Sequence, residues 1–291
     1  MRHLEKAEII FDQYRICPVY VLDYPVVFQA DGYRPVQELY ASKRCLIGAH
    51  LHPWVNPPFE EILSSETSFP GNLSRSLELG KLKMLGDTIG ERFGVSPVMY
   101  KAGRYGVGKH TADILEDLGY EVDLSVCPLM DYSEEGGPDF TCSTAWPYWF
   151  GRDRRLLELP LTVGFSGLLR RWGSRLRRIA SSPVLRSLHG VGALARLRLA
   201  DRIWLSPEGY SSAEHQRLVR DLFDDGLRIF AFTFHSPSLE PGNTPYVRSA
   251  ADLEKFLSRF RKFFDFFFGD LGGCASTPIE LKRKLARNIS E

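Results

Sequence analysis

The sequence predicts an α/β protein built as one barrel or one doubly wound domain. Apolar runs of strand length alternate with amphipathic stretches of helix length through most of the 291 residues. Short connections between such runs are typical of parallel βαβ units. The length allows one barrel-sized domain or two smaller ones. Because the alternation continues almost to the C-terminus, we treat residues 1–291 as a single domain.

The expected elements come directly from this alternation. The first is a short amphipathic helix, and the strand that ends in "GAHLH" leads into a Pro-rich loop. Helix and strand then alternate as far as the Phe-rich stretch "FFDFFF". The predicted helices cover 4–14, 36–44, 77–93, 108–119, 212–227 and 250–268, and the predicted strands cover 17–27, 45–52, 96–103, 121–126 and 228–236.

Composition excludes several classes of protein. The net charge is +1, so no global field favours nucleic acid, and we expect no nucleic-acid partner. Aromatic residues make up 12% of the chain, which suits contact with carbohydrate. The five cysteines form no CxxC pair and fit reduced thiols. No signal peptide and no apolar window of about 18 residues is present, which predicts a cytoplasmic protein.

An arginine-rich segment at about 166–203 interrupts the alternation and is predicted to be a helical insertion. Residues 168–202 contain nine arginines and a single acid, Asp201. Apolar residues recur there at helical spacing. Two interpretations remain open. The segment forms surface helices with solvated basic faces, or it forms an edge that meets an anionic membrane surface or an acidic polymer.

Two histidines at the end of a predicted strand suggest a metal site. His50 and His52 are separated by one residue, so they share a face if the segment is extended. Two neutral imidazoles that converge on one point suit a cation such as Zn²⁺. The alternative is a pair of histidines that hydrogen-bond to the backbone at the junction of strand and loop.

Further polar residues follow other predicted strands. His235 ends the run "FAFTFH", while Lys101 and Arg104 come at the end of "VMYKAGR". In parallel α/β folds, functional groups gather at the carboxyl ends of the strands. We therefore expect these residues to share one site with the histidine pair. The remaining histidines are predicted to lie at the surface, namely His3, His110, His189 and His215.

Three sequence blocks together resemble a known family. They are "IGAHLHPWVNPPFEE", "YKAGRYGVG..TADILEDLGYEVDLSV" and "FTFHSPSLEPGNTPYVRS". In this order they resemble polysaccharide deacetylases of the NodB-homology type (carbohydrate esterase family 4), most of all the branch associated with bacterial exopolysaccharide. The resemblance spans residues 5–280. It implies a distorted (β/α)7-type barrel and metal-dependent hydrolysis of N-acetyl groups on a polysaccharide or oligosaccharide.

The resemblance also implies roles for individual residues. His50 and His52 match the metal-binding histidines, with Zn²⁺ as the expected ion. The family spaces these two histidines more widely, so His52 is the better match. His235 matches the histidine that acts as general acid toward the departing nitrogen, and an imidazole suits that role near neutral pH.

The third family motif offers an arginine that orients the catalytic base. Lys101 stands at the matching position and Arg104 follows three residues later. Lysine lacks the planar guanidinium group that can donate two hydrogen bonds to one carboxylate. We therefore favour Arg104 as the site cation and keep Lys101 as the alternative. Trp54 and Tyr105 are candidates for aromatic rings that stack on a sugar. The alternative is that they only pack against other residues of the protein.

One family motif has no clear counterpart. The resemblance implies a strand with adjacent acidic residues before the helix at 4–14, which leads us to expect a barrel without its first strand and weak or absent deacetylase activity. Asp12 lies within the helical stretch, and Asp23 ends the next strand as a structural or secondary carboxylate. Two alternatives stay open: a non-catalytic carbohydrate-binding or scaffold protein on this fold, or a hydrolase of small cyclic amides.

Overall fold

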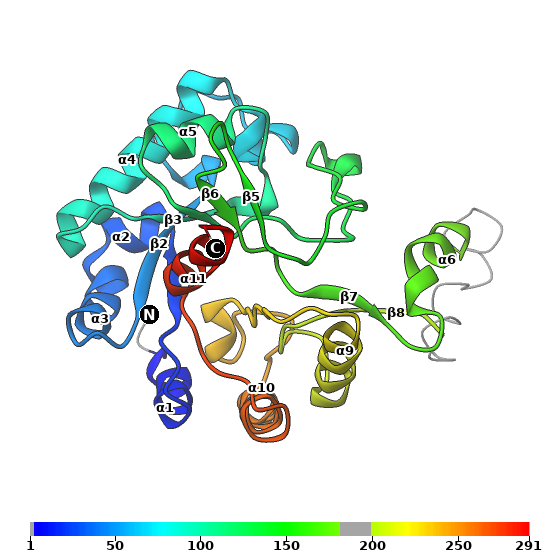
Figure 1. The fold of residues 1–291 in the computed structure, drawn as a ribbon. Coiled ribbons are helices and arrows are strands. Elements are labelled where there is room, and N and C mark those ends of the chain that lie inside the picture. The colour runs from blue at the N-terminus through cyan, green and yellow to red at the C-terminus, as the bar shows by residue number, and fades with distance from the viewer. Residues whose placement is uncertain (1–2, 181–198, 291) are drawn as a thin grey trace.

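The computed structural model describes residues 3–180 and 199–290, and it confirms the predicted α/β class (Figure 1). Among these residues, no helix combines the length and the apolar character that crossing a membrane requires. The helices are α1 Glu5–Gln13, α2 Tyr24–Phe28, α3 Ala30–Ala41, α4 Arg75–Phe93, α5 Thr111–Asp117, α6 Gly173–Ala180, α9 Ser212–Asp224, α10 Ala250–Phe264 and α11 Pro278–Ser290, and the strands are β1 Val19–Leu22, β2 Leu46–Leu51, β3 Met99–Ala102, β4 Val122–Asp123, β5 Tyr148–Phe150, β6 Leu156–Glu158, β7 Val163–Ser166 and β8 Asp201–Trp204.

Two separate sheets carry these strands. The larger has the order β1-β2-β3-β4-β6-β5, and all neighbours are parallel except the β5–β6 pair. The smaller sheet is the antiparallel pair β7–β8. Within the described residues no ladder joins the two sheets, so the closed barrel stays a prediction. Since the five parallel strands run together, their carboxyl ends lie along one edge of the larger sheet.

The C-terminal helix α11 shows which side chains share one face of this sheet. Apolar residues near the amino ends of four strands form a cluster with α11, which lies near the middle of the molecule in Figure 1. Side chains alternate along a strand, so residues an even number of positions further on point to the same face. His50 is four residues beyond the first member of this cluster on β2, and Lys101 is two residues beyond the member on β3. The cluster includes Val19, Leu46, Met99 and Leu157 of the strands and Ile279, Leu281 and Leu285 of α11.

The opposite face of the larger sheet packs against helices α4 and α5. Ala49 and Tyr100 are fully buried there and are register partners on β2 and β3. They belong to the main core together with apolar residues of the two helices, namely Leu82, Leu85, Ile89, Ile114 and Leu115. Burial on both faces explains why these strands are continuous apolar runs in the sequence.

The predicted strand at 228–236 is wrong in type, because the structure has an extended segment without a ladder there. The N–H of Ala231 donates to the Thr162 hydroxyl at 2.8 Å, and that of Thr233 donates to the Leu205 carbonyl at 3.3 Å. Alternate phenylalanines turn toward α10 instead, where Phe232 stacks on Phe263 at 5.0 Å between ring centroids. Aromatic packing against a helix therefore holds this segment extended.

The predicted strand at 17–27 is also too long. It ends at Leu22, and α2 begins at once. The Asp23 carboxylate accepts the N–H of Val26 at 3.1 Å, and Pro25 occupies the first turn. An aspartate cap followed by proline is a strong helix start, which overrides the β propensity of the valines. Asp23 thus has the structural role that the sequence predicted for it.

The loop that follows the histidine pair is anchored by a buried lysine. The Lys81 ammonium on α4 donates to the carbonyls of Pro53, Asn56 and Pro58 at 3.1, 2.6 and 2.6 Å. It also forms an ion pair with the buried Glu61 carboxylate at 2.9 Å. The three ammonium protons are thereby occupied, and the buried charge is compensated. The ammonium fixes the path of the loop immediately beyond the histidines.

The arginine-rich insertion is described only in part. Its first part forms α6, a helix that follows β7. Residues 181–198, including His189, lie outside the described residues.

Replacing Lys81 with Met should lower the free energy of unfolding by about 3–5 kcal/mol, because the buried Glu61 carboxylate loses its counter-charge and three carbonyls lose their donor. Chemical denaturation followed by circular dichroism measures the change. Lys83→Met is the matched control, since Lys83 is exposed on the same helix and pairs with Asp87; it should cost less than about 1 kcal/mol. Equal effects of the two variants would contradict the role assigned to Lys81.

Candidate functional site

The histidine pair lies where β2 ends, and its rings are in contact. The centroids of His50 and His52 are 4.3 Å apart, with the rings nearly perpendicular. His50 Nδ1 is 2.9 Å from the carbonyl oxygen of Lys101. A carbonyl only accepts, so this nitrogen carries the proton and Nε2 of the neutral ring has a free lone pair. His52 Nδ1 is buried and has no hydrogen-bond partner among the described residues.

Both rings are held neutral by their surroundings. Burial, followed by the charge of His52, lowers the pKa of His50 well below its ordinary value. Burial and the charges of His235 and Lys101 lower the pKa of His52 to about 4. Neutral imidazoles at physiological pH can accept a proton or bind a metal ion. The ring of Trp54 packs on His52 at 4.5 Å between centroids and is partly exposed.

The pKa of His235 is shifted in the opposite direction from the pKa values of His50 and His52. The charge of His235 contributes to the lowered pKa of both His50 and His52. Side chains alternate along this segment, so residues an even number apart lie on the same side. His235 is six residues beyond Ile229, which belongs to the cluster that packs against α11. A hydrogen bond from His235 to Glu208, together with the charge of that carboxylate, raises the pKa of His235.

Glu208 is a site residue that was not predicted from the sequence. Its buried carboxylate accepts from His235 Nδ1 at 2.7 Å and from the His235 backbone N–H at 3.1 Å. The Ser238 hydroxyl donates to it at 2.5 Å. This arrangement fixes the His235 tautomer and leaves Nε2 on the exposed side of the ring, whose side chain is 66% exposed. The available signal was an acidic residue just beyond the apolar run "RIWL", a position equivalent to those of the histidines.

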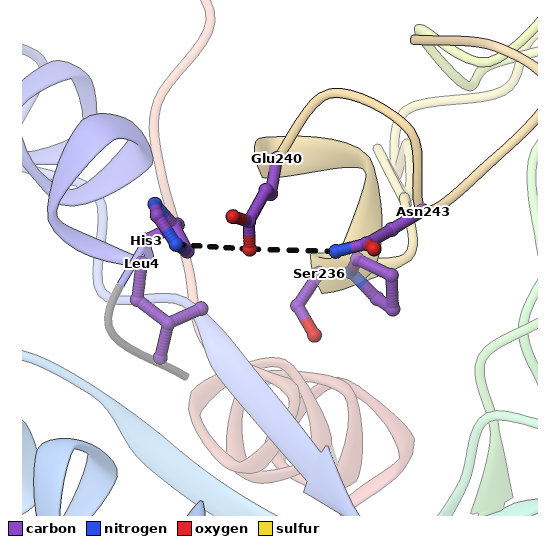
Figure 2. A pocket seen from close by; sticks show the side chains of 6 residues that line it. His3, Leu4, Ser236, Glu240 and Asn243 are labelled. Carbon is purple, nitrogen blue, oxygen red and sulfur yellow. Dashed lines mark hydrogen bonds and ion pairs between the residues drawn. The ribbon is translucent and has the colours of Figure 1, made fainter. Parts of the chain in front are cut away.

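A small pocket of about 160 Å³ lies behind the turn that follows His235 (Figure 2). Figure 2 shows Glu240 between His3 and Asn243. The Glu240 carboxylate is 2.9 Å from His3 Nε2 and accepts from Asn243 Nδ2 at 3.4 Å. These contacts tie the N-terminal residues to the turn Ser236–Leu239, so this part of the chain helps to hold the segment that carries His235.

Lys101 lies beside the histidines, although its ammonium group is occupied. Its Nζ donates to the Leu124 carbonyl at 2.9 Å and lies 4.6 Å from the centre of the Tyr105 ring. Burial lowers its pKa. Tyr105 in turn packs between Tyr132 and Trp204, at 5.4 and 5.8 Å between centroids. The predicted sugar wall at Tyr105 is therefore built into an aromatic cluster that also covers the lysine.

Arg104, the favoured site cation, is directed toward a neighbouring loop. Its backbone has a positive φ of 52°, and its guanidinium lies 4.2 Å from the Phe69 ring centre. It forms an ion pair with Glu135 and a hydrogen bond with the Ser68 hydroxyl. Its charge is one cause of the lowered pKa of His52, which shows that it is near the site. Lys101 is the cation whose backbone contacts His50.

A second acidic feature that was not predicted is a buried carboxyl pair on β4 and β6. Asp123 and Glu158 are register partners and hydrogen-bond to each other. Burial raises the pKa of Asp123 to about 6 and that of Glu158 well above its ordinary value. The Lys101 charge acts in the other direction and favours the ionised form of Asp123. A polar residue inside the apolar run "EVDLSV" was the available signal.

The donors at this edge fall short of a complete zinc site. Within the described part of the chain, no group of three or more His, Cys, Asp and Glu side chains is placed to hold a metal ion. His50 and His52 offer two nitrogens, whereas catalytic zinc generally has three protein ligands. Asp23 follows β1 next to β2, but its carboxylate caps α2.

The surface position predicted for His215 is wrong. Its side chain is fully buried between α9 and α10, and Nε2 lies 2.7 Å from the Ser206 carbonyl. Burial lowers its pKa to about 4. Its ring packs edge-on against Phe232 and Phe263, so a neutral histidine serves as an aromatic core residue here.

Comparison with known proteins adds one weak likeness. No protein-family model matches the chain. No curated protein matches it either. Among solved structures it resembles a chain described as "putative polysaccharide deacetylase from Mycobacterium smegmatis", with 18% identity, 55% of this chain and 45% of that chain covered, and a TM-score of 0.39. The match thus spans less than half of that chain, and a likeness at this level carries no argument about the activity.

Replacing Glu208 with Gln should lower the pKa of His235 to or below its ordinary value of 6.5, because the carboxylate that raises it is gone. The pKa of His235 is higher in the folded state than in the unfolded state. The His235–Glu208 pair therefore stabilises the fold fully below pH 6.5, and this stabilisation is lost as pH rises through the raised pKa. NMR titration of the ring protons measures the shift.

Glu240→Gln is the matched control for this titration, since Glu240 pairs with His3 instead. It should leave the pKa of His235 unchanged. An unaltered His235 titration in Glu208→Gln would rule out the dyad.

Proposed function

We propose that the protein hydrolyses an amide, of the N-acetyl type, on a carbohydrate. The observation that supports this proposal is the set of imidazoles whose pKa values are shifted in opposite directions, with Glu208 bound to the Nδ1 of His235. His235 is held toward the protonated form by Glu208, whereas His50 and His52 are held neutral. The substrate class comes from the family resemblance of the three sequence blocks.

The chemistry of amide hydrolysis matches these states. The nitrogen leaves only after it gains a proton, and His235 can donate one from its exposed Nε2 because Glu208 holds Nδ1. After transfer, the Glu208 carboxylate keeps the neutral ring in the same orientation. Attacking water must lose a proton, and the single lone pair on Nε2 of His50 can either accept a hydrogen bond from that water or bind a metal ion that activates it. Trp54 offers a partly exposed ring for stacking on a sugar.

We also propose Zn²⁺ as the ion bound by His50 and His52. A zinc ion would lower the pKa of a bound water and polarise the amide carbonyl. The two described imidazole ligands provide only part of the usual donor set. For that reason we expect weak zinc binding and slow turnover unless a further ligand completes the site.

The alternative is a carbohydrate-binding or scaffold protein without turnover. The incomplete set of metal donors among the described residues favours it. So does the engagement of Arg104 with Glu135 rather than with a site carboxylate. In this alternative the aromatic groups near the histidines still bind sugar, while replacement of His235 has no kinetic consequence.

Replacing His235 with Gln should reduce the rate of acetate release from an N-acetylated oligosaccharide by at least about 100-fold, because the leaving nitrogen loses its proton donor. Chromatographic measurement of acetate, with and without added Zn²⁺, tests this. His110→Gln is the control and should keep the wild-type rate. Equal rates for the two variants would refute the assigned role, and a wild-type protein that binds the oligosaccharide without releasing acetate would establish the alternative.

Zinc binding by calorimetry gives a readout that is independent of activity. His52→Ala should weaken Zn²⁺ binding by at least about tenfold, because a two-nitrogen site loses half of its donors. His110→Ala is the control, since His215→Ala would remove a core residue. Unchanged affinity in His52→Ala would exclude the histidine pair as the zinc site.

A further inference from the structure

An exposed apolar face is present where the chain leaves β7. The side chains of Leu168, Trp172 and Ile179 are 85%, 56% and 59% exposed, although each is large and apolar. They lie on the short turn after β7 and on α6, which projects from the far end of the β7–β8 hairpin in Figure 1. Large exposed apolar side chains that follow one another so closely along the chain indicate an interaction surface.

The same segment concentrates the positive charge of the protein. Within the described part of this segment, residues 168–180 carry five arginines and no acid, a net charge of +5. The whole chain has a net charge of +1, so the remaining residues together carry −4. Such a separation gives the molecule a strong charge asymmetry, with the apolar face at its positive end.

Part of this charge is available to a partner. Arg170 is paired with Asp221 on α9 and with Asp225 immediately after it, which fixes the base of the segment to the body. Arg175 is exposed and lies 5.2 Å from the centre of the Trp172 ring. An arginine beside an exposed tryptophan is an arrangement suited to the interface between lipid headgroups and acyl chains.

The combination of exposed apolar groups and excess arginine selects one occupant. An anionic polysaccharide or nucleic acid would neutralise the arginines but would give Leu168 and Ile179 nothing apolar to contact. A second copy of this chain that packed through the same face would set like charges against each other. An anionic bilayer satisfies both requirements, since its surface attracts the arginines and its acyl boundary accepts the apolar side chains.

We propose that the face formed by Leu168, Trp172 and Ile179, with the arginines around it, docks on the surface of an anionic phospholipid bilayer. The acidic remainder of the chain is repelled by the same surface, which orients the molecule with α6 toward the bilayer. β8 runs away from α6 toward Glu208, so docking leaves the Glu208–His235 pair at the other end of the hairpin. This inference does not depend on the proposed function.

Co-sedimentation of the full chain with vesicles tests it. We expect binding to vesicles of phosphatidylglycerol and phosphatidylcholine and little binding to phosphatidylcholine alone. The double variant Leu168→Ser/Ile179→Ser should bind at least about tenfold more weakly, because the groups that insert are removed. Arg175→Glu should weaken binding about fivefold or more.

A second exposed apolar stretch provides the matched control. Phe59, Ile62 and Leu63 are also exposed, but no run of arginines accompanies them in the sequence. Ile62→Ser/Leu63→Ser therefore removes a similar apolar area from another surface. Arg34→Glu reverses the charge of an exposed arginine on α3. Both controls should bind the anionic vesicles as the wild type does.

Three outcomes would overturn the proposal. The first is absence of binding to the anionic vesicles. The second is wild-type binding by Leu168→Ser/Ile179→Ser, which would indicate a purely electrostatic anion surface. The third is self-association in sedimentation velocity that the same double variant abolishes, because a second copy of the chain would then cover the apolar face.

Discussion

The parallel pairing of β1 through β4 with β6 is the constraint on which the candidate site depends. It brings the carboxyl ends of the strands to one edge, and side-chain alternation then decides which residues meet there. The cluster with α11 shows which side chains near the amino ends of the strands lie on the face that packs against α11. His50 and Lys101, which are register partners, consequently point to the same face beyond it. Any shift of one residue in register would turn the imidazoles toward α4 and α5.

Burial and the Glu208 carboxylate then shift the pKa values of the site histidines in opposite directions. His52 has lost most of its hydration, and its Nδ1 has no partner among the described residues, so its pKa falls. His235 keeps contact with solvent and gains Glu208, so its pKa rises. Environments that push pKa values apart are a common means by which proteins divide acid and base roles. Burial also raises the pKa values of the Asp123–Glu158 pair, on which the Lys101 charge acts.

Supporting contacts from distant parts of the chain keep this edge rigid. Lys81 fixes the loop after His52 through four interactions. His3 and Glu240 hold the turn after His235 from the N-terminal side. The phenylalanines of α10 hold the segment that carries His235 without a strand ladder. A site assembled from separate elements needs such supports, because small displacements of its groups impair chemistry.

Local sequence patterns were sufficient for the α/β class, most helix positions and the histidine pair at the end of β2, because hydrophobic periodicity is a local property. They also predicted a strand at 228–236 and a surface His215, since apolar alternation does not show whether a ladder or a helix covers a segment. Contacts between segments far apart in the chain set the rest. The orientation of His235 by Glu208 and the turn of Arg104 toward Glu135 depend on such contacts, which no local pattern encodes.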